Sequence, residues 1–242
     1  MRHTRIFVDL PLAVGDAVTL PPGATRHVTQ VLRLAADAPL ILFNGDGCDY
    51  PARLLTSHRA TATALIQDVT APEPPMPLAI HLALGVSKGE RMEYALQKAV
   101  ELGVSRLTPL FTERSQVRLE GERLARRLEH WRGVVIGACE QSGRRRLPLL
   151  DPALALESWL AEWTAGGVLL DPEAAQALIN LPAPNGEITL LIGPEGGLSA
   201  SERQQVKKQG FQGVRLGSRI LRTETAPLAA IAVIQALWGD FK

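Results

Sequence analysis

The chain has 242 residues, of which 46% are hydrophobic and 21% charged, and this ordinary globular composition excludes a disordered or strongly charged chain. The net charge of +1 gives no hint of a polyanionic partner. No apolar run reaches the ~18 to 20 residues of a membrane span, and the first ten residues lack the apolar region of a signal peptide, which favours the cytoplasm. Cys48 and Cys139 stand alone and the histidines lack ligand spacing, so we expect neither a disulfide nor a metal site.

Charge is distributed unevenly along the sequence. Residues 114–146 contain nine Arg and four Glu, and residues 203–222 contain six basic residues and no acid. Residues 147–202, between them, contain eight acids and no Lys or Arg. Blocks of this kind can present a basic face in a protein of small net charge, although ordinary solvated helix faces give the same pattern.

Residues 1–71 alternate short strand-like runs with turns, which is typical of a small barrel when only one helix interrupts them. A helix is predicted over Thr25–Leu34. Four prolines between Ala71 and Pro77 cannot continue a helix or a central strand, so we place a linker at residues 72–77. The predicted strands are Arg5–Leu10, Ala17–Leu20, Leu40–Phe43, Cys48–Leu55 and Thr61–Val69.

After the linker, strands alternate with helices, which favours one α/β domain with a mainly parallel sheet over residues 78–242. The last helix is apolar on almost every side, which indicates either a core helix or a subunit interface. The predicted strands are Leu78–Val86, Arg106–Phe111, Gly167–Leu170, Ile188–Ile192 and Val214–Leu216. The predicted helices are Glu90–Leu102, Glu122–Gln141, Leu154–Trp163, Ser199–Gln209 and Thr225–Trp238.

Three loops contain residue types that bind ligands. The first, Gly193–Gly197, follows an apolar strand and precedes a helix with a capping box, so its glycines could expose N–H donors to a ligand or simply form a tight turn. Its spacing matches neither a dinucleotide fingerprint nor a P-loop. The second, Leu216–Ala226, contains Arg222 and Glu224, which could serve a substrate or pair with each other. The third, Arg144–Arg146, could bind phosphate or form a basic surface turn.

In this order, these segments resemble the RsmE family, the 16S rRNA uridine-N3 methyltransferases of the SPOUT superfamily. The resemblance spans nearly the whole chain, and its most specific strings are Gly193–Ser199 and Arg219–Ala226. The other matching segments are Arg5–Phe7, His27–Arg33, Lys98–Gly103, Glu140–Arg144 and Leu216–Gly217.

The resemblance implies an α/β fold of SPOUT type with a C-terminal deep trefoil knot over residues 78–242, preceded by a PUA-like RNA-binding β-barrel over residues 1–71. Strand and helix periodicity does not predict such a knot, which general rules of topology disfavour. The resemblance further implies S-adenosylmethionine as the cofactor, 16S rRNA within the small ribosomal subunit as the partner, and a homodimer without membrane or metal.

The resemblance also assigns roles to residues. Arg222 would stabilise negative charge on the uracil carbonyls, and Glu224 or a water would accept the N3 proton. The expected cofactor-binding residues are Leu170, Leu191, Ile192, Gly193, Glu195, Gly196, Gly197, Leu216, Gly217, Ile220, Leu221, Thr223 and Ala226. The expected RNA-binding residues, mostly contacting phosphates, are Arg2, Arg5, His27, Arg33, Arg91, Arg144, Arg145 and Arg146.

Two positions depart from the family pattern. Ala36 lies where the family often has a Gly-Asp turn, and Asp171 lies in a loop that varies within the family. These departures bear on how RNA docks and on the contacts to the adenosine edge of the cofactor, more than on the reaction. A second function stays open: a non-catalytic RNA-binding ribosome-assembly factor with a degenerate cofactor pocket. Binding of S-adenosylmethionine discriminates between the two.

Overall fold

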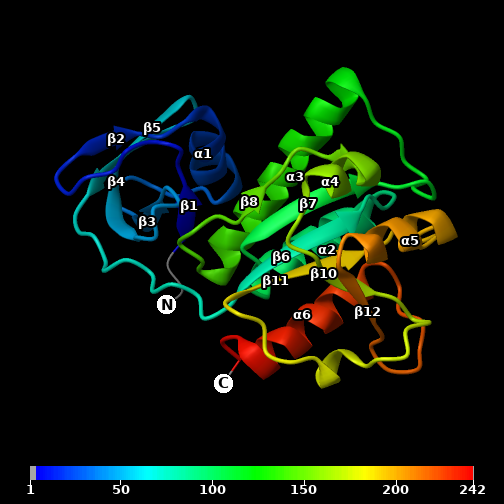
Figure 1. The fold of residues 1–242 in the computed structure, drawn as a ribbon. Helices are drawn as coiled ribbons and strands as arrows, with labels where there is room; N and C mark the ends of the chain where they lie inside the picture. The colour runs from blue at the N-terminus through cyan, green and yellow to red at the C-terminus, as the bar shows by residue number, and fades with distance from the viewer. Residues whose placement is uncertain (1–3, 242) are drawn as a thin grey trace. The chain divides into compact units, whose positions relative to one another are not determined.

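The structure is a computed structural model that describes residues 4–241 and divides into two compact units (Figure 1). The first unit comprises the chain up to Pro75 together with Ile136–Leu147, and the second comprises Met76–Val135 and the chain from Pro148 onward. The cut between Pro75 and Met76 falls in the proline-rich segment. The first unit therefore also takes a stretch from the middle of the chain.

A five-stranded sheet forms the first unit, in the order β1-β3-β4-β5-β2. β1 is parallel to β3, and the other neighbours are antiparallel. Burial alternates along β5, where Ala62, Ala64 and Ile66 face the core, as expected for a strand with one buried face. The strands are β1 (Arg5–Phe7), β2 (Ala17–Thr19), β3 (Pro39–Phe43), β4 (Tyr50–His58) and β5 (Thr61–Ile66).

The helix of this unit differs from the prediction over Thr25–Leu34. It begins earlier, as α1 (Pro22–Arg26), because Pro22 suits the first turn of a helix. It continues as a π-helical turn, η1 (His27–Val31), and ends before Arg33, whose φ of 52° is left-handed.

Three strands of the first unit differ from the prediction by more than one residue at an end. The strand predicted over Arg5–Leu10 ends at Phe7. The strand predicted over Cys48–Leu55 begins at Tyr50, because the Asp46 carboxylate accepts the Cys48 N–H at 2.7 Å and forms a turn there. The strand predicted to reach Val69 ends at Ile66.

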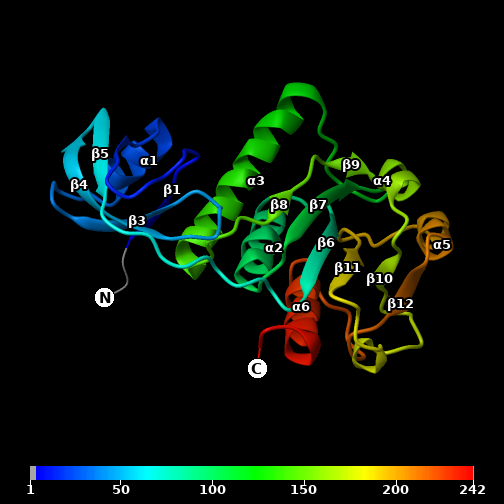
Figure 2. The ribbon, with the colours of Figure 1, turned by 60° about the vertical axis from the view of Figure 1, so that its left-hand side comes forward.

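The second unit contains a seven-stranded sheet in which the paired strands are parallel, in the order β12-β10-β11-β6-β7-β8, with β9 also paired to β7 (Figure 2). β6 and β11 are buried over almost their whole length, as continuous apolar strands of parallel sheets are. The strands are β6 (Ala79–Gly85), β7 (Arg106–Phe111), β8 (Leu149–Leu150), β9 (Leu154–Ala155), β10 (Gly167–Leu170), β11 (Glu187–Ile192) and β12 (Phe211–Val214).

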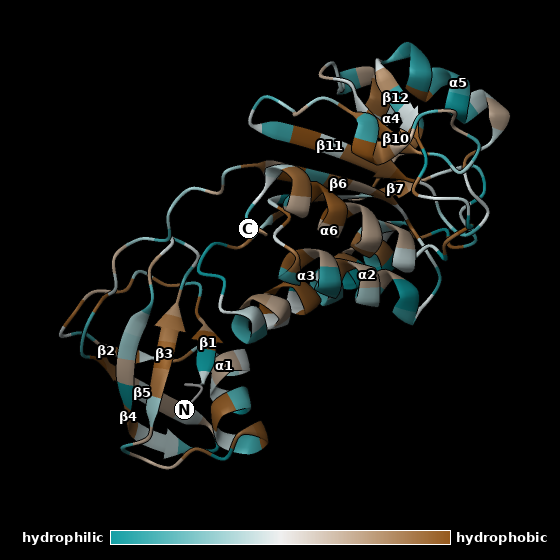
Figure 3. Cartoon of the chain, turned by 90° about the horizontal axis from the view of Figure 1, so that it is seen from below, coloured by the Kyte–Doolittle hydropathy of each residue, from teal (hydrophilic) through white to brown (hydrophobic). Residues whose placement is uncertain are grey.

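Helices cover both faces of this sheet: α2 and α6 lie on one face, and α4 and α5 lie on the other (Figure 3). Ser199 and Glu202 form the predicted capping box of α5, with hydrogen bonds in both directions. No helix within residues 4–241 is long and apolar enough to cross a bilayer. The helices are α2 (Glu90–Glu101), α3 (Gly121–Ser142), α4 (Leu156–Glu162), η2 (Leu178–Asn180), α5 (Ala200–Lys208) and α6 (Thr225–Trp238).

Two elements of the second unit correct the sequence prediction. The strand predicted over Val214–Leu216 is Phe211–Val214, so Leu216 lies in the loop that follows it. The helix predicted from Leu154 begins at Leu156, because Leu154 and Ala155 pair with β7 as the short strand β9. The first difference lengthens the loop beyond the carboxyl end of β12.

A buried polar cluster lies near the start of β6 and β7. The Nε2 atom of His81 is 2.7 Å from the Thr108 hydroxyl, which donates its own proton to the Asp151 carboxylate; Arg106 Nε also donates to that carboxylate, at 2.7 Å. Because the Thr108 proton is used on Asp151, His81 donates from Nε2 and leaves Nδ1 without a proton. Burial lowers the pKa of His81 to about 4, so His81 is neutral in the folded protein near neutral pH.

Candidate functional site

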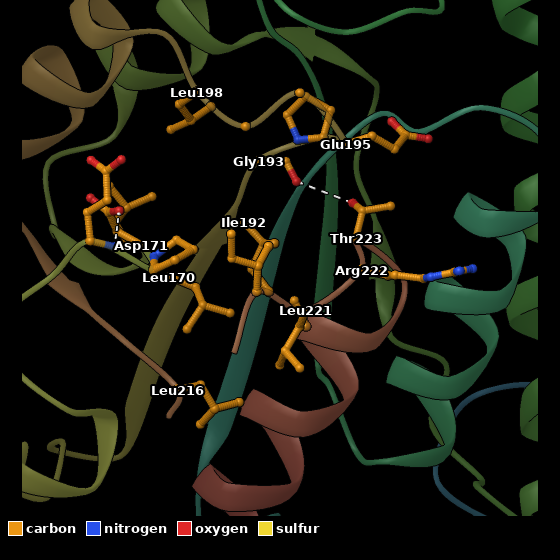
Figure 4. A pocket seen from close by; sticks show the side chains of 18 of the residues that line it. Leu170, Asp171, Ile192, Gly193, Glu195, Leu198, Leu216, Leu221, Arg222 and Thr223 are labelled. Carbon is orange, nitrogen blue, oxygen red and sulfur yellow. Dashed lines mark hydrogen bonds between the residues drawn. The ribbon is translucent and has the colours of Figure 1, made fainter. Parts of the chain in front are cut away.

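A cavity of about 530 Å³ opens in the second unit, beyond the carboxyl ends of β10 and β11 and against the loop after β12 (Figure 4). Ligands of parallel α/β sheets bind in this position. Three loops line the cavity: Leu169–Glu173, Ile192–Leu198 and Leu216–Ala226. They bring together all but one of the residues that the resemblance assigned to cofactor binding, and Arg222 and Glu224 as well.

Leu191 is the exception. It is buried in the apolar core with Ala83 and Leu169 and does not line the cavity. Successive residues of a strand point to opposite faces, so Ile192 faces the cavity while Leu191 packs in the core. The Leu191 side chain therefore does not contribute to the cavity wall.

Close packing of backbone forms the wall between β6 and the loop after β11. A Cβ atom on Gly85 would collide with the backbone nitrogen of Pro194, so this approach requires glycine. The turn that follows closes when Gly197 N–H donates to Pro194 O at 2.8 Å, and Gly197 has a φ of +65°. These contacts hold the Ile192–Leu198 loop in one conformation beside the cavity.

Thr223 connects the third loop to the segments that follow β6 and β11. Its hydroxyl lies 3.2 Å from that of the buried Ser87 and 3.4 Å from Gly193 O, the contact drawn in Figure 4. The residue before α6 is Glu224, which makes no side-chain capping bond. Thr223 instead positions the loop that contains Arg222.

The cavity has an apolar wall and a polar wall. Leu170, Ile192, Leu216 and Leu221 project toward its centre from three different loops (Figure 4). Asp171 closes one end; its Oδ1 accepts the Glu173 N–H at 3.0 Å, and its side chain is almost fully buried.

Charged side chains form the other end of the cavity. Glu195 Oε1 accepts the Lys88 N–H at 3.1 Å and the Arg91 Nη1–H at 3.3 Å. Its second oxygen, Oε2, is buried and has no hydrogen-bond partner within residues 4–241. The side chains of Glu195 and Arg222 extend to the same side of the cavity (Figure 4), and no bond or ion pair joins Arg222 to Glu224 in that part of the chain.

Sequence reasoning missed Arg114 and Arg203, which also line the cavity. Arg114 Nη1 donates to Gly196 O at 3.0 Å, and Arg203 pairs with Glu173 at 2.8 Å. No local motif surrounds either residue. The charge blocks were the available signal, since both arginines come from basic segments and meet the acidic block at the cavity.

Several arginines expected to bind RNA make internal contacts in the first unit. Arg5 forms an ion pair with Asp49, stacks over Phe43 with its Cζ 4.6 Å from the ring centroid, and has a side chain only 10% exposed. Arg5 Nη2 also donates to Arg144 O at 2.9 Å. Arg145 Nε lies 3.3 Å from Asp49 Oδ2. These guanidinium groups therefore hold the 144–145 turn on the sheet.

Glutamates of the first unit complete this attachment. The Phe7 N–H donates to Glu140 Oε1 at 3.0 Å, and burial raises the pKa of that carboxyl group. The Arg145 and Arg146 N–H groups both donate to Glu73 Oε2, at 3.3 and 3.1 Å.

The other expected RNA-binding residues differ in exposure. Arg33 and Arg146 are exposed, His27 is half-buried, and Arg91 lies at the cavity with its side chain 51% exposed. Arg2 lies outside the described residues.

Residues 74–235 match the family model of the RNA methyltransferase domain. This defines the class of protein: an RNA methyltransferase with an α/β fold. A protein named Ribosomal RNA small subunit methyltransferase E from Buchnera aphidicola is 32% identical over 241 residues, which are 99% of this chain and 98% of that one. The chain belongs to the family of small-subunit ribosomal RNA methyltransferase E.

Two solved structures resemble the chain over its full length. Ribosomal RNA small subunit methyltransferase E from Neisseria gonorrhoeae, bound to S-adenosyl methionine, is 42% identical with a TM-score of 0.95 and covers 99% of this chain and 100% of its own. A methyltransferase from Legionella pneumophila, in complex with the cofactor SAM, is 38% identical with a TM-score of 0.96 and covers 100% of both chains.

Proposed function

We propose that this protein transfers a methyl group from S-adenosylmethionine to N3 of one uridine in the 16S rRNA of the small ribosomal subunit. The cavity at the carboxyl ends of the parallel strands carries the proposal, because the loops that line it are the ones that the RsmE resemblance assigns to cofactor and catalysis. Relatives named for small-subunit rRNA methylation support it, and so do two similar solved structures that contain the cofactor.

The residues present fit S-adenosylmethionine. A volume of about 530 Å³ suits a ligand of this size, and the wall of Leu170, Ile192, Leu216 and Leu221 offers an apolar bed for an adenine ring. Asp171 adds the negative charge that a cationic ligand needs. When bound, the cofactor supplies an activated methyl group on a sulfonium.

The protein's own contribution is to position the uracil and handle its charge. Arg222 reaches the cavity from the loop that Thr223 holds in place, and it can stabilise negative charge on a uracil carbonyl when the N3 proton leaves. The tight packing of Gly85 against Pro194 keeps the loop after β11 fixed while the base enters.

The proposal includes the wider organisation of the protein. We propose a deep trefoil knot formed by the three cavity loops, a PUA-like RNA-binding barrel over residues 1–71, and a cytoplasmic homodimer. The supporting features are the five-stranded sheet with one helix and the exposed apolar side chains of the second unit, among them Ile179, Ile220 and Leu237.

RNA binding is expected to come from exposed arginines. Arg33, Arg91 and Arg146 are exposed enough to contact phosphates, so binding should weaken steadily as salt is added. Arg5 and Arg145, which are engaged with Asp49, are expected to act on RNA through the shape of the 144–146 turn.

The test uses rRNA from a strain that lacks this protein. Mass spectrometry of nucleosides should show the loss of N3-methyluridine from 16S rRNA, and the purified protein with S-adenosylmethionine should restore it on small subunits from that strain. If N3-methyluridine is retained in the strain, the proposal is wrong. A non-catalytic assembly factor would instead give no heat of S-adenosylmethionine binding in calorimetry.

A further inference from the structure

Resting on the proposed function, we propose that Glu195 accepts the uracil N3 proton at Oε2, with Arg91 and Arg222 donating to the two flanking carbonyl oxygens. This replaces Glu224 as the expected proton acceptor. The inference begins with one unusual atom: Glu195 lines the cavity, and its Oε2 is buried without a hydrogen-bond partner in the described part of the chain. A buried carboxylate oxygen without a partner costs free energy, so its retention at a cavity points to a donor on the ligand.

The other oxygen of Glu195 explains how the group is held. Oε1 accepts hydrogen bonds from Lys88 N–H and from Arg91, which orient the carboxylate and leave Oε2 as its free acceptor. The loop that contains Glu195 is fixed by the contact of Pro194 with Gly85 and by the Gly197–Pro194 turn. A group that acts on a proton gains from being oriented before the substrate arrives.

The other carboxylates that line the cavity fit this role less well. Asp171 accepts the Glu173 N–H, and Glu173 is paired with Arg203. The Glu224 side chain makes no hydrogen bond or ion pair within residues 4–241, so no contact fixes its direction. Glu195 is the cavity carboxylate that combines a fixed orientation with a free buried oxygen.

The charges beside Glu195 match the edge of uracil that reacts. That edge presents a carbonyl acceptor, the N3–H donor and a second carbonyl acceptor, in that order. Arg91 is bonded to Glu195, and Arg222 extends to the same side of the cavity (Figure 4), so the protein offers two cationic donors and one acceptor. Cytosine lacks the N3–H donor, so the same arrangement would discriminate against it.

The proton and the electrons balance without a further reactant. The N3–H bond breaks, its proton moves to Glu195 Oε2, and its electron pair becomes available on N3 for the new bond to the methyl carbon, while the sulfur keeps the pair of the broken bond. Arg91 and Arg222 stabilise the negative charge that spreads onto the carbonyl oxygens meanwhile. Glu195 then releases the proton to solvent.

The test compares Glu195→Gln with the wild type and with Glu157→Gln, an exposed residue of α4, as the matched control. Single-turnover formation of N3-methyluridine is measured on small subunits that lack the modification, between about pH 6 and pH 9. We expect Glu195→Gln to lose about 100-fold near neutral pH and to recover about tenfold per pH unit on going alkaline, since the uracil then ionises without a base. The control should follow the wild type.

Calorimetry with S-adenosylmethionine provides the readout that a cofactor-binding or structural role would move. Glu195→Gln should bind the cofactor within about threefold of the wild type and melt at the same temperature, because it keeps the Oε1 contacts. Unchanged activity, or a loss that follows cofactor affinity without alkaline recovery, overturns the proposal. So does alkaline recovery in Glu224→Gln instead. Inactive wild-type protein would refute the proposed function itself.

Discussion

Near the start of β6 and β7, the Thr108 hydroxyl is hydrogen-bonded to both His81 and Asp151. Beyond the carboxyl ends of the same sheet, by contrast, the side chains of Arg222 and Glu224 make no hydrogen bond or ion pair within residues 4–241. Trp163 packs against the first group, with its ring centroid 4.9 Å from that of His81. Arg222 and Glu224 line a cavity.

The contrast teaches how to separate structural charge from functional charge in one sheet. A charge with buried partners on neighbouring strands lowers the free energy of the folded state and has little left to offer a ligand. A charge at a cavity without such partners, such as the exposed Arg222, stays available to whatever binds there. Substitutions at the two ends should therefore divide into losses of stability and losses of activity.

The largest effect is expected on stability, in the hydrogen-bonded cluster of His81, Thr108 and Asp151. Asp151→Ala removes the acceptor of Thr108 and Arg106 from a nearly buried site and should destabilise the protein by about 3 kcal/mol, measured by urea unfolding. The control is Glu122→Ala, which removes the ion pair between the highly exposed side chains of Glu122 and Arg126 on α3. It should change the free energy of unfolding by less than about 0.5 kcal/mol. Equal losses in both variants would contradict the structural role of Asp151.

At the cavity, Arg222→Ala should lower activity and leave stability unchanged. Methyl transfer should fall about 100-fold, because a donor to the developing negative charge is lost, while the urea midpoint stays the same. Arg126→Ala on the exposed face of α3 controls for the loss of one positive charge. Activity within a few-fold of the wild type would show that Arg222 has no electrostatic role.

The next largest effect is expected from acid, which should lower the stability of the protein through His81. The pKa of His81 is about 4 in the folded protein and ordinary in the unfolded chain, so the unfolded chain binds the proton more tightly. Its contribution to stability is full above about pH 6.5 and is lost as pH falls toward 4, which gives about 2 kcal/mol lost by pH 5. His81→Gln should flatten this part of the pH–stability curve; an unchanged slope would argue against His81 as the cause.

The smallest effect is expected where local structure supports the cavity. Ser199→Ala removes the cap of α5 at the end of the Ile192–Leu198 loop and should cost about 1 kcal/mol of stability. Cofactor affinity, measured by calorimetry, should stay within about threefold, because Ser199 does not line the cavity. A large drop in affinity would mean that the cap also shapes the site.

The sequence predicted features that depend on neighbours in the chain. The capping box of Ser199 and Glu202 and the cavity loops from Gly193 and Leu216 follow from local spacing. The exact ends of β12 could not be predicted, since its pairing with β10 decides them.

Partners far apart in the chain could not be predicted. Asp49 meets Arg5 and Arg145, and Thr108 meets Asp151, only after the sheets have formed. The free Oε2 of Glu195 is likewise visible only in three dimensions, because Oε1 of the same carboxylate is bonded to Lys88 and to Arg91 of α2, far away in the chain.

The membership of Ile136–Leu147 in the first unit has a consequence for biosynthesis. At about 5–20 residues per second, this stretch leaves the translating ribosome several seconds after Pro75. Until then Asp49 lacks Arg145, Arg5 lacks the Arg144 carbonyl, and Glu73 lacks the turn that it accepts from. The amino-terminal sheet can form early in synthesis, but it becomes complete only when the nascent chain has supplied the end of α3.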